Sequence, residues 1–526
     1  MNGYGLKNYA QPPSGWDWTD LLVQPHIYAF NHVVMSQNGE KPIYYEGWHQ
    51  TDVLRIKALE QLDILTRQHK PFYLEIAPAS PHVRIGGWPT VPLARHMFHF
   101  PGATAPRTPN WNPLDDEEHS KKPAWVGMLE VMNRSVVEAV DRSFRARLQG
   151  LQGVDEIVED VFALLERRGV LEDTFVIYTT DNGESCSAHW VQCDRTNVRA
   201  SGFHLGNHRV SGGKGLPYIE DTNLPLAVRG PGIPRARQLS IPSSHVDMAP
   251  TLLDIAGVPP EDWPEFFDGR SLLSEWQNQE SKEDGISREV LNVEFWGSTV
   301  APKEEWTTRH HDNTYKSLRL VGEKQGWLFN RWCTSNQTEL YNTIADPYEL
   351  HNLAVDPSDE IKRVMNRLSG LLLVTKSCGR DSCRKPWDVL RSSCDETVMS
   401  DGEATFSDLE GAMDSKYDAF FASLPHFGFH SCVPYQKVEN EGPYFPAESE
   451  DLGRRYRAEE DGTVDAVSWM APVTPDVESE EYFGDLSQRY ATADDLERTA
   501  RALTEAQMGS SIRCTAPDYC VEMYED

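Results

Sequence analysis

The chain has 526 residues, a mass of 59.6 kDa, 39% hydrophobic residues and a formal net charge of −31. This length exceeds one ordinary hydrophobic core and indicates two or three domains, while the hydrophobic content excludes a disordered chain. The excess of acid argues against nucleic acid as a partner. No run of about 18 apolar residues occurs, so the sequence predicts no membrane span. The oligomeric state stays open.

The predicted elements of the first 285 residues alternate between helices and buried strands. Apolar residues three or four apart indicate helices, and short apolar runs indicate strands. In chain order these elements are a helix over 51–68, a strand over 70–77, a helix over 144–168, strands over 174–180 and 223–229, and a helix over 245–256. This alternation favours an α/β domain with a mostly parallel sheet.

From about residue 285 the predicted strands become short and closely spaced. They cover 289–295, 317–321 and 326–332, and a helix follows over 360–375. This order is typical of a small antiparallel sheet with one packed helix. We therefore expect three regions: an α/β domain over 1–285, a smaller α+β domain over 286–395, and an extension over 396–526.

The last of these regions is strongly acidic. Residues 401–526 contain 28 acidic and 9 basic residues, which is typical of a solvated, loop-rich and partly disordered tail. A binding role for this tail is the alternative interpretation.

Cysteines and glycosylation sequons favour a secreted ancestry. Six of the nine cysteines lie beyond residue 377, and Asn133 and Asn336 each begin a sequon. The N-terminus has no basic region and no apolar region, so the chain as written carries no signal peptide and its localisation stays open. This mismatch suggests that Met1 is not the natural start.

Chemically versatile residues follow the predicted strands. Asp181 and Asn182 come directly after the strand 174–180 and offer the hard oxygens that Ca²⁺ or Mg²⁺ prefers. His82 follows the strand 70–77, and a glycine-rich stretch carries His204 and Lys214, which suit an anionic oxygen cluster.

Each of these groups also has a purely structural interpretation. Asp181 and Asn182 would form an ordinary Asp-Asn-Gly turn, His82 would be a structural histidine whose hydrogen bonds are all made within the protein, and the stretch with His204 and Lys214 would be a solvated basic loop. Together they indicate metal-assisted hydrolysis of an anionic ester. The cation would cancel the charge of the ester, and Lys214 would hold an outer oxygen as charge builds up in the transition state.

Five segments carry a specific family resemblance. They are residues 71–82, 178–183, 214–225, 244–257 and 339–354. In these segments, which occur in family order, the chain resembles type I sulfatases of the alkaline-phosphatase-like superfamily. It is most similar to fungal arylsulfatases and the N-acetylglucosamine-6-sulfatase branch. The resemblance implies a mixed, mostly parallel sheet sandwiched by helices, and a secreted or lumenal protein that acts on a small-molecule or glycan sulfate ester.

The resemblance also implies roles for individual residues. Asp181 and Asn182 would be two ligands of Ca²⁺, with Mg²⁺ possible. His82 would lie beside the sulfate and the leaving oxygen, Lys214 would contact sulfate oxygens, and His204 would match a pocket histidine. A phosphatase or phosphodiesterase of the same superfamily is a lesser alternative, because Asn182 and the segment 339–354 follow the sulfatase pattern.

The chain departs from the family at its nucleophile. Sulfatases use a formylglycine made from Cys or Ser in the motif C/S-x-P-x-R, and no such motif occurs in the 526 residues. The paired aspartates that complete the family's metal site are also missing. The expected explanation is a chain that begins at an internal methionine. A non-catalytic sulfatase-like protein that binds a glycan or a partner is the alternative.

A second departure is an insertion at the predicted metal site. Residues 184–202 separate Asp-Asn-Gly from the stretch with His204, which are adjacent in the family. The insertion lacks apolar periodicity. We expect a retained intron of 57 nucleotides, with a genuine surface loop as the alternative.

Overall fold

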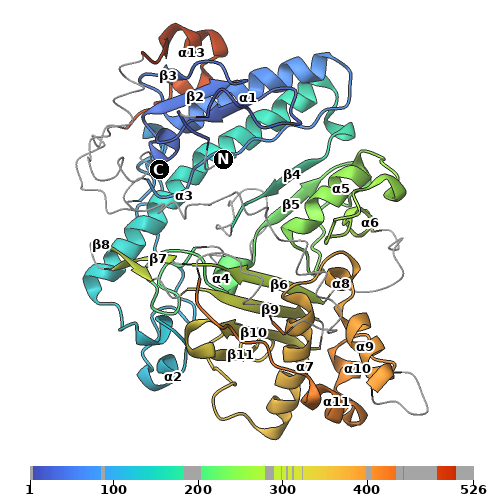
Figure 1. Cartoon of the computed structure of the whole chain (residues 1–526). Coiled ribbons are helices and arrows are strands. Elements are labelled where there is room, and N and C mark those ends of the chain that lie inside the picture. Colours follow the sequence, from blue (N-terminus) through green and yellow to red (C-terminus); the bar gives the residue numbers. More distant parts are fainter. Residues whose placement is uncertain are drawn as a thin grey trace.

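The chain is a mixed α/β protein with a separate antiparallel sheet (Figure 1), as the sequence predicts. The computed structural model describes residues 4–6, 8–84, 89–182, 203–278, 289–297, 299–303, 306–310, 313–322, 324–397, 404–433, 442–443 and 482–504. The insertion 184–202, interpreted from the sequence as a retained intron or a surface loop, therefore lies entirely outside the described residues. Within the described residues, no helix is long and apolar enough to cross a membrane.

Two long helices form the body of the N-terminal domain. Helix α1 (Gln50–Arg67) matches the predicted helix, and α3 (Arg134–Arg168) begins ten residues before the prediction. The early start is explained by Asn133, whose Oδ1 accepts a hydrogen bond from the amide of Val136 at 3.1 Å. The first turn of α3 is largely exposed, so apolar periodicity could not mark it.

Close packing joins α1 to α3. A side chain at Gly153 of α3 would meet Thr51 and Leu93 at less than 3 Å. The glycine at this position therefore allows the two helices to approach closely. Val53 and Ile56 of α1 in turn pack against residues of the first sheet of this domain.

The strands of the N-terminal domain pair in antiparallel fashion. One sheet has the order β1–β2–β3–β12, and a second contains β4 and β5. Their bounds are Asp20–Leu22 (β1), Val33–Gln37 (β2), Ile43–Tyr45 (β3), Val176–Thr179 (β4), Leu226–Arg229 (β5) and Ala500–Ala502 (β12). The short helices here are α2 (Asp116–Ser120), α4 (Ile219–Thr222), α5 (Met248–Ile255) and α6 (Leu273–Trp276).

The predicted mostly parallel sheet is not found among the described residues, where every pairing between named strands is antiparallel. A parallel pair needs a long crossover, usually a helix. Between β4 and β5 the described residues contain only the four-residue helix α4. The alternation of helices and strands thus predicted the class correctly and the direction of pairing wrongly.

The predicted strand over residues 70–77 is also wrong. These residues form no strand and pair with no neighbouring strand in the described part of the chain. Instead, Phe72 and Leu74 pack against Leu62, Leu164 and Leu165 of α1 and α3. An apolar run favours extended backbone, but a strand also needs a neighbour with which to form a ladder.

The C-terminal domain is built as predicted, as an antiparallel sheet with a packed helix. The main sheet has the order β11–β10–β9–β6, and α7 (Asp359–Thr375) packs on it (Figure 1). The strands are β6 (Val290–Phe295), β7 (Thr299–Lys303), β8 (Trp306–His310), β9 (Tyr315–Val321), β10 (Gly326–Trp332) and β11 (Thr338–Asn342).

The domain continues past the predicted boundary at residue 395. Further helices are α8 (Asp381–Arg384), α9 (Pro386–Thr397), α10 (Leu409–Ala412) and α11 (Asp418–Ser423). Phe406, Phe421 and Phe427 belong to the same buried core as Leu368 and Leu372 of α7. Part of the expected acidic extension is therefore core of the small domain.

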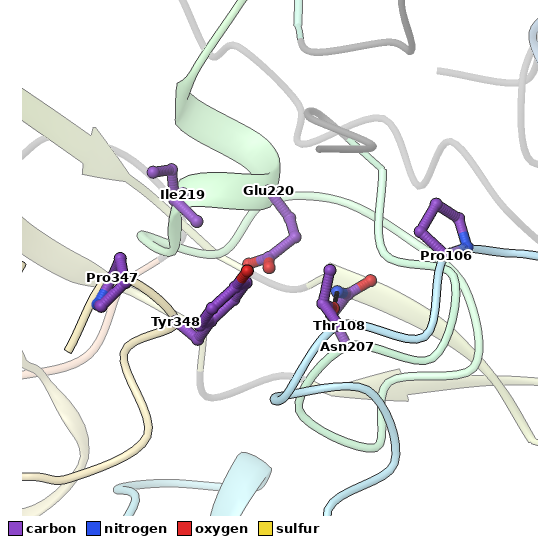
Figure 2. A pocket seen from close by; sticks show the side chains of 7 residues that line it. All are labelled: Pro106, Thr108, Asn207, Ile219, Glu220, Pro347 and Tyr348. Atoms are coloured by element: carbon purple, nitrogen blue, oxygen red, sulfur yellow. Dashed lines mark hydrogen bonds between the residues drawn. The ribbon is translucent and has the colours of Figure 1, made fainter. Parts of the chain in front are cut away.

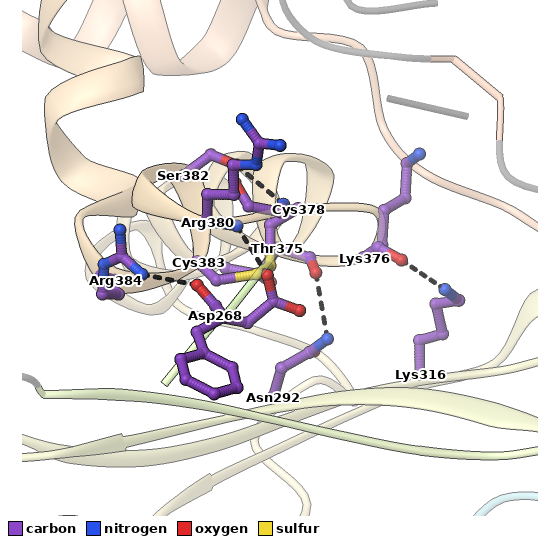
Figure 3. Close-up of a disulfide and its surroundings, with 12 residues drawn as sticks. Asp268, Asn292, Lys316, Thr375, Lys376, Cys378, Arg380, Ser382, Cys383 and Arg384 are labelled. Atoms are coloured by element: carbon purple, nitrogen blue, oxygen red, sulfur yellow. Dashed lines mark hydrogen bonds between the residues drawn. A yellow bond between two sulfur atoms is a disulfide. The ribbon is translucent and has the colours of Figure 1, made fainter. Parts of the chain in front are cut away.

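Two disulfides lie in this domain. Cys333 bonds to Cys432 across 99 residues, and Cys378 bonds to Cys383 across five. The short one closes a loop that contacts residues 265–268: the amide of Arg380 donates to Asp268, and Arg384 donates to the carbonyl of Phe267 (Figure 3).

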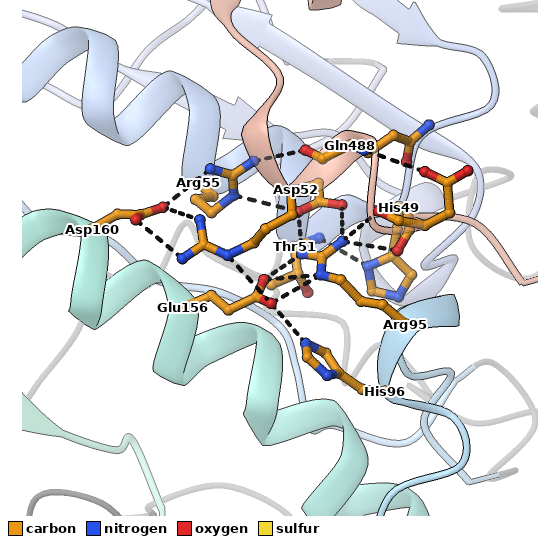
Figure 4. A network of polar contacts seen from close by, with 12 residues as sticks. His49, Thr51, Asp52, Arg55, Arg95, His96, Glu156, Asp160 and Gln488 are labelled. Atoms are coloured by element: carbon orange, nitrogen blue, oxygen red, sulfur yellow. Dashed lines mark hydrogen bonds and ion pairs between the residues drawn. The ribbon is translucent and has the colours of Figure 1, made fainter.

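The segment 482–504 returns to the N-terminal domain. It contains α13 (Ala493–Thr499) and adds β12 to the edge of β3. Figure 4 shows the charged network beneath it, in which Arg95 binds Asp52 of α1 and Glu156 of α3. Arg95 also donates to the carbonyl of Gly484 at 2.8 Å, so the network ties the segment to both helices.

The two predicted glycosylation sites differ in their surroundings. Asn133 is exposed at the start of α3. The amide of Asn336 is engaged with Phe429: its Nδ2 donates to the carbonyl at 3.1 Å and its Oδ1 accepts from the amide at 2.7 Å. A glycan on Asn336 would compete with this contact.

We therefore expect folded protein from a glycosylating host to carry a glycan on Asn133 and an unmodified Asn336. Peptide mass mapping after enzymatic deglycosylation measures both occupancies, and Asn133→Gln is the control that should remove the mass increment. Full occupancy of Asn336 in folded protein would contradict the expectation.

Candidate functional site

His82 lies in a turn beside the aromatic ring of Tyr28. Its Nδ1 donates to the carbonyl of Val83 at 2.6 Å, and its ring stacks on Tyr28 with centroids 4.2 Å apart. The Nδ1 contact leaves Nε2 as the nitrogen that carries the lone pair when the ring is neutral. The turn and the stacked ring thus fix both the orientation and the tautomer of His82.

Lys214 and Asp181 lie within electrostatic reach of His82. Burial lowers the pKa of His82 to about 4; the bond to Val83 opposes this shift, the charges of Lys214 and Arg147 add to it, and Asp181 opposes it. These residues come from four separate segments of the chain. The structure therefore brings together three of the predicted site residues, with Arg147 of α3 as a fourth group.

Asp181 and Asn182 follow β4 directly, as predicted. The Oδ1 of Asp181 accepts a hydrogen bond from the amide of Asn182 at 2.9 Å, and the side chain of Asp181 is exposed. Thr180 donates to the carbonyl of Asn182, which closes a tight turn. The carboxylate of Asp181 therefore lies exposed at the end of the strand, beside the half-buried Asn182.

His204 is placed differently from the other predicted residues. It is fully buried, and its Nδ1 lies 3.1 Å from Asp221 Oδ1. Burial alone would lower the pKa of His204, but the charge of Asp221 and their hydrogen bond outweigh it and raise that pKa. The Oδ2 of Asp221 also accepts a hydrogen bond from the backbone amide of Leu216 at 2.6 Å. These contacts suit a residue that positions the loop of Lys214.

A buried network of charged and polar side chains packs around α4, which follows the loop that carries Lys214. Asn207, Glu220 and Tyr348 line a small pocket of about 10 Å³ where α4 meets the C-terminal domain (Figure 2). Glu220 accepts a hydrogen bond from Asn110 at 2.8 Å, and Glu349 accepts from the amide of Ile219 at 2.9 Å. The C-terminal domain therefore holds the segment that carries the site.

Two sets of residues can be compared with the needs of a divalent metal. Asp181 and Asn182 supply two oxygens, whereas Ca²⁺ takes six to eight. Within the described residues, His208, Glu220 and Glu349 also lie close enough to hold an ion. Three of their four carboxylate oxygens, however, already bind Asn110, Ile219 or Arg319. The first set fits the metal in part, and the second is already satisfied by protein donors.

Sequence reasoning missed Tyr28 and Arg147. Tyr28 precedes His82 by 54 residues, and Arg147 lies on a helix that is marked in the sequence by its apolar face and not by its polar residues. Arg147 donates to the carbonyl of Pro81 at 3.2 Å and lies over the ring of Phe203. Neither contact has a local sequence signal, because each joins segments that are distant in the chain.

Comparison with known proteins identifies a family. The family model described as "Sulfatase" matches residues 3–258. An arylsulfatase of Chlamydomonas reinhardtii is 31% identical over 475 residues, which cover 84% of this chain and 67% of that protein. The N-acetylglucosamine-6-sulfatase of Bos taurus is 27% identical over 416 residues, which cover 73% of this chain and 66% of that protein.

A solved structure in complex with D-glucosamine-2-N,6-O-disulfate aligns with a TM-score of 0.47 and 21% identity over 66% of this chain and 73% of that one. The chain spans about two thirds of the length of the two relatives named above. The family model and the arylsulfatase match carry the assignment. The chain belongs to the sulfatase family, the sulfuric ester hydrolases of the alkaline-phosphatase-like superfamily.

Proposed function

We propose that this chain binds a sulfate ester of an aryl compound or a sugar at the site formed by His82, Lys214 and Asp181, and that this is the active site of a sulfuric ester hydrolase. The observation that carries the proposal is the effect of Lys214 and Asp181 on His82 across three distant segments. A cation, an oriented imidazole and a carboxylate at one place suit an anionic ester beside a metal.

Each residue has a distinct task in this proposal. Lys214 holds the outer sulfate oxygens through charge-assisted hydrogen bonds. His82 is neutral near pH 7 because its pKa is about 4, so its Nε2 carries a lone pair that can accept a hydrogen bond from the bound ester. His204 acts through Asp221 and positions the loop of Lys214.

Asp181 and Asn182 would hold a divalent metal, Ca²⁺ or Mg²⁺, which would withdraw charge from the ester oxygens when bound. Two oxygens alone bind such an ion weakly, so we expect poor affinity for calcium by calorimetry. Tight binding by the 526-residue chain would contradict this part of the proposal.

The nucleophile is the part that this chain does not supply. None of its 526 residues lies in a C/S-x-P-x-R motif, so no formylglycine can form from that motif. This observation favours a second candidate function, a sulfatase-like protein that binds a sulfate ester without cleaving it. The two disulfides suit a secretory compartment for either function.

Replacing Lys214 by Gln is expected to weaken binding of 4-nitrocatechol sulfate at least about tenfold, because one charge-assisted hydrogen bond contributes about 1.5–3 kcal/mol. Isothermal titration calorimetry measures the affinity. Lys324→Gln is the matched control, since Lys324 is exposed and pairs only at 3.4 Å with Glu410.

Equal affinities of the two variants would overturn the proposed site. Release of 4-nitrocatechol by the purified chain distinguishes the two functions. We expect none above background; turnover that depends on Lys214 would establish hydrolysis and would require a nucleophile outside the family motif.

A further inference from the structure

A second cavity lies in the C-terminal domain, on the face of the sheet that α7 covers. It has a volume of about 140 Å³ and is lined from β10, β11, α7 and the segment 426–427. Arg331, Lys362 and His426 line it, together with neutral and apolar residues, and none of the described residues that line it is acidic. In a chain with a net charge of −31, a cavity with two cations and no acid is a distinctive local environment.

Arg331 is the most constrained of these groups. It lies opposite Thr338 in the β10–β11 ladder, and its Nη1 donates to the hydroxyl of Thr338. Its Nε is buried and has no hydrogen-bond partner in the described part of the chain. Burial lowers the pKa of the Arg331 guanidinium. A guanidinium that is partly desolvated and lines a cavity without an acidic partner there favours an anionic ligand, whose oxygens would offset the cost of its burial.

The remaining polar groups surround the same space. Ser369 Oγ and His426 Nδ1 are 2.8 Å apart, and Asn366 lines the cavity beside them. Lys362 pairs with Asp359 at 3.0 Å, but Asp359 is 99% exposed, so water screens that pair and the ammonium can turn to the cavity. The groups that can donate hydrogen bonds belong to Arg331, Lys362, Asn366, Ser369 and His426. This number of donors is larger than a single carboxylate with two oxygens would use and suits an anion with four oxygens.

The wall of the cavity at residues 426–427 is held in place. The chain that follows this wall is anchored to β10 and the turn after it: the disulfide between Cys333 and Cys432 links it five residues on, and two hydrogen bonds between Asn336 and Phe429 hold it two residues on. Phe427 itself is buried in the core. The donors of the cavity are therefore arranged before any ligand arrives, which favours binding.

We propose that this cavity is a binding site for a tetrahedral oxyanion, sulfate or phosphate, with the guanidinium of Arg331 as its first cation and Lys362 as its second. The site is separate from that of Lys214 and does not depend on the proposed hydrolase function. A free anion and one carried on a sugar share this chemistry.

The test is calorimetric titration of the full chain with sodium sulfate, sodium phosphate and glucosamine-6-sulfate, with NaCl holding the ionic strength constant. We expect saturable binding that Arg331→Gln weakens at least about tenfold. Arg134→Gln is the matched control, because it removes the same charge from a side chain that is 92% exposed. The same titrations are repeated in Lys214→Gln, which weakens the proposed active site, and the loss caused by Arg331→Gln should persist in that background, which separates the cavity from the proposed active site.

The three probes identify the ligand: the anion bound most tightly is assigned, and preference for the sugar sulfate over free sulfate indicates a carried anion. Absence of saturable binding of any probe would overturn the proposal, as would equal binding by Arg331→Gln and Arg134→Gln. If Arg331→Gln does not fold, as judged by circular dichroism, Lys362→Gln replaces it; an unchanged affinity in that folded variant would overturn the role of the cation pair.

Discussion

Replacing Cys333 and Cys432 together by alanine is expected to lower the free energy of unfolding by about 4–5 kcal/mol. The disulfide closes a loop across 99 residues, and the entropy that such a link removes from the unfolded chain grows with loop length. The same relation gives about 2 kcal/mol for the bond between Cys378 and Cys383, which spans five residues. The pair Cys378→Ala and Cys383→Ala is therefore the matched control.

Urea unfolding followed by tryptophan fluorescence gives both free energies. The long-loop variant should also loosen the segment near Phe429, which lies against Asn336. Equal losses in the two double variants would show that loop entropy does not set the contribution of the long disulfide. A loss of stability only in the variant without the Cys378–Cys383 bond would show that the short disulfide, and not the long one, stabilises the fold.

Local patterns predicted the helices and the C-terminal sheet well. The amphipathic spacing over 51–68 gave α1 within one residue at each end, and the short strands after residue 285 gave β6, β9 and β10. These elements bury one face along a continuous stretch of chain, so each carries its own signal. The same logic explains why the exposed first turns of α3 were missed.

Pairing between distant segments was not predictable from local patterns. The run over 70–77 has the composition of a strand, yet it packs on α1 and α3 without a ladder in the described residues. β12 joins β3 from more than 450 residues away, and nothing in the acidic extension marks it as a strand. Direction and partner depend on contacts that one segment does not encode.

The candidate site follows the same division. His82, Asp181 and Lys214 could be predicted because their motifs are contiguous in the sequence. Tyr28, which stacks on His82, and Arg147, which binds the carbonyl of Pro81, reach the site only through folding. The catalytic and metal roles of the predicted residues remain predictions that the experiments above test.

Replacing Arg95 by Met is expected to destabilise the N-terminal domain by about 3–5 kcal/mol, the usual cost of removing one partner from a buried ion pair. Arg95 lies 2.7 Å from Asp52, which is fully buried, and also binds Glu156. Without Arg95, the ion pair that Asp52 keeps among the described residues is the longer one with Arg55 at 3.4 Å. A buried carboxylate would then face a single, more distant cation.

The matched control is Arg134→Met, which removes an exposed pair with Glu138 and should cost no more than about 0.5 kcal/mol. Arg95→Met also removes the bond to the carbonyl of Gly484. We therefore expect the segment 482–504 to become more sensitive to limited proteolysis in this variant and not in the control.

Acid titration provides a second, independent measurement of the same network. Burial raises the pKa of Glu156, but Arg95 and His96 outweigh it and hold that pKa at about 2. Because the folded-state pKa is depressed, the contribution of Glu156 is present above about pH 4.5 and is lost as the pH falls toward 2; it amounts to about 3 kcal/mol. In Arg95→Met the stability should change much less over this interval. A variant that loses less than about 1 kcal/mol at pH 7 and keeps the wild-type acid dependence would show that Arg95 does not hold the two helices and the C-terminal segment together.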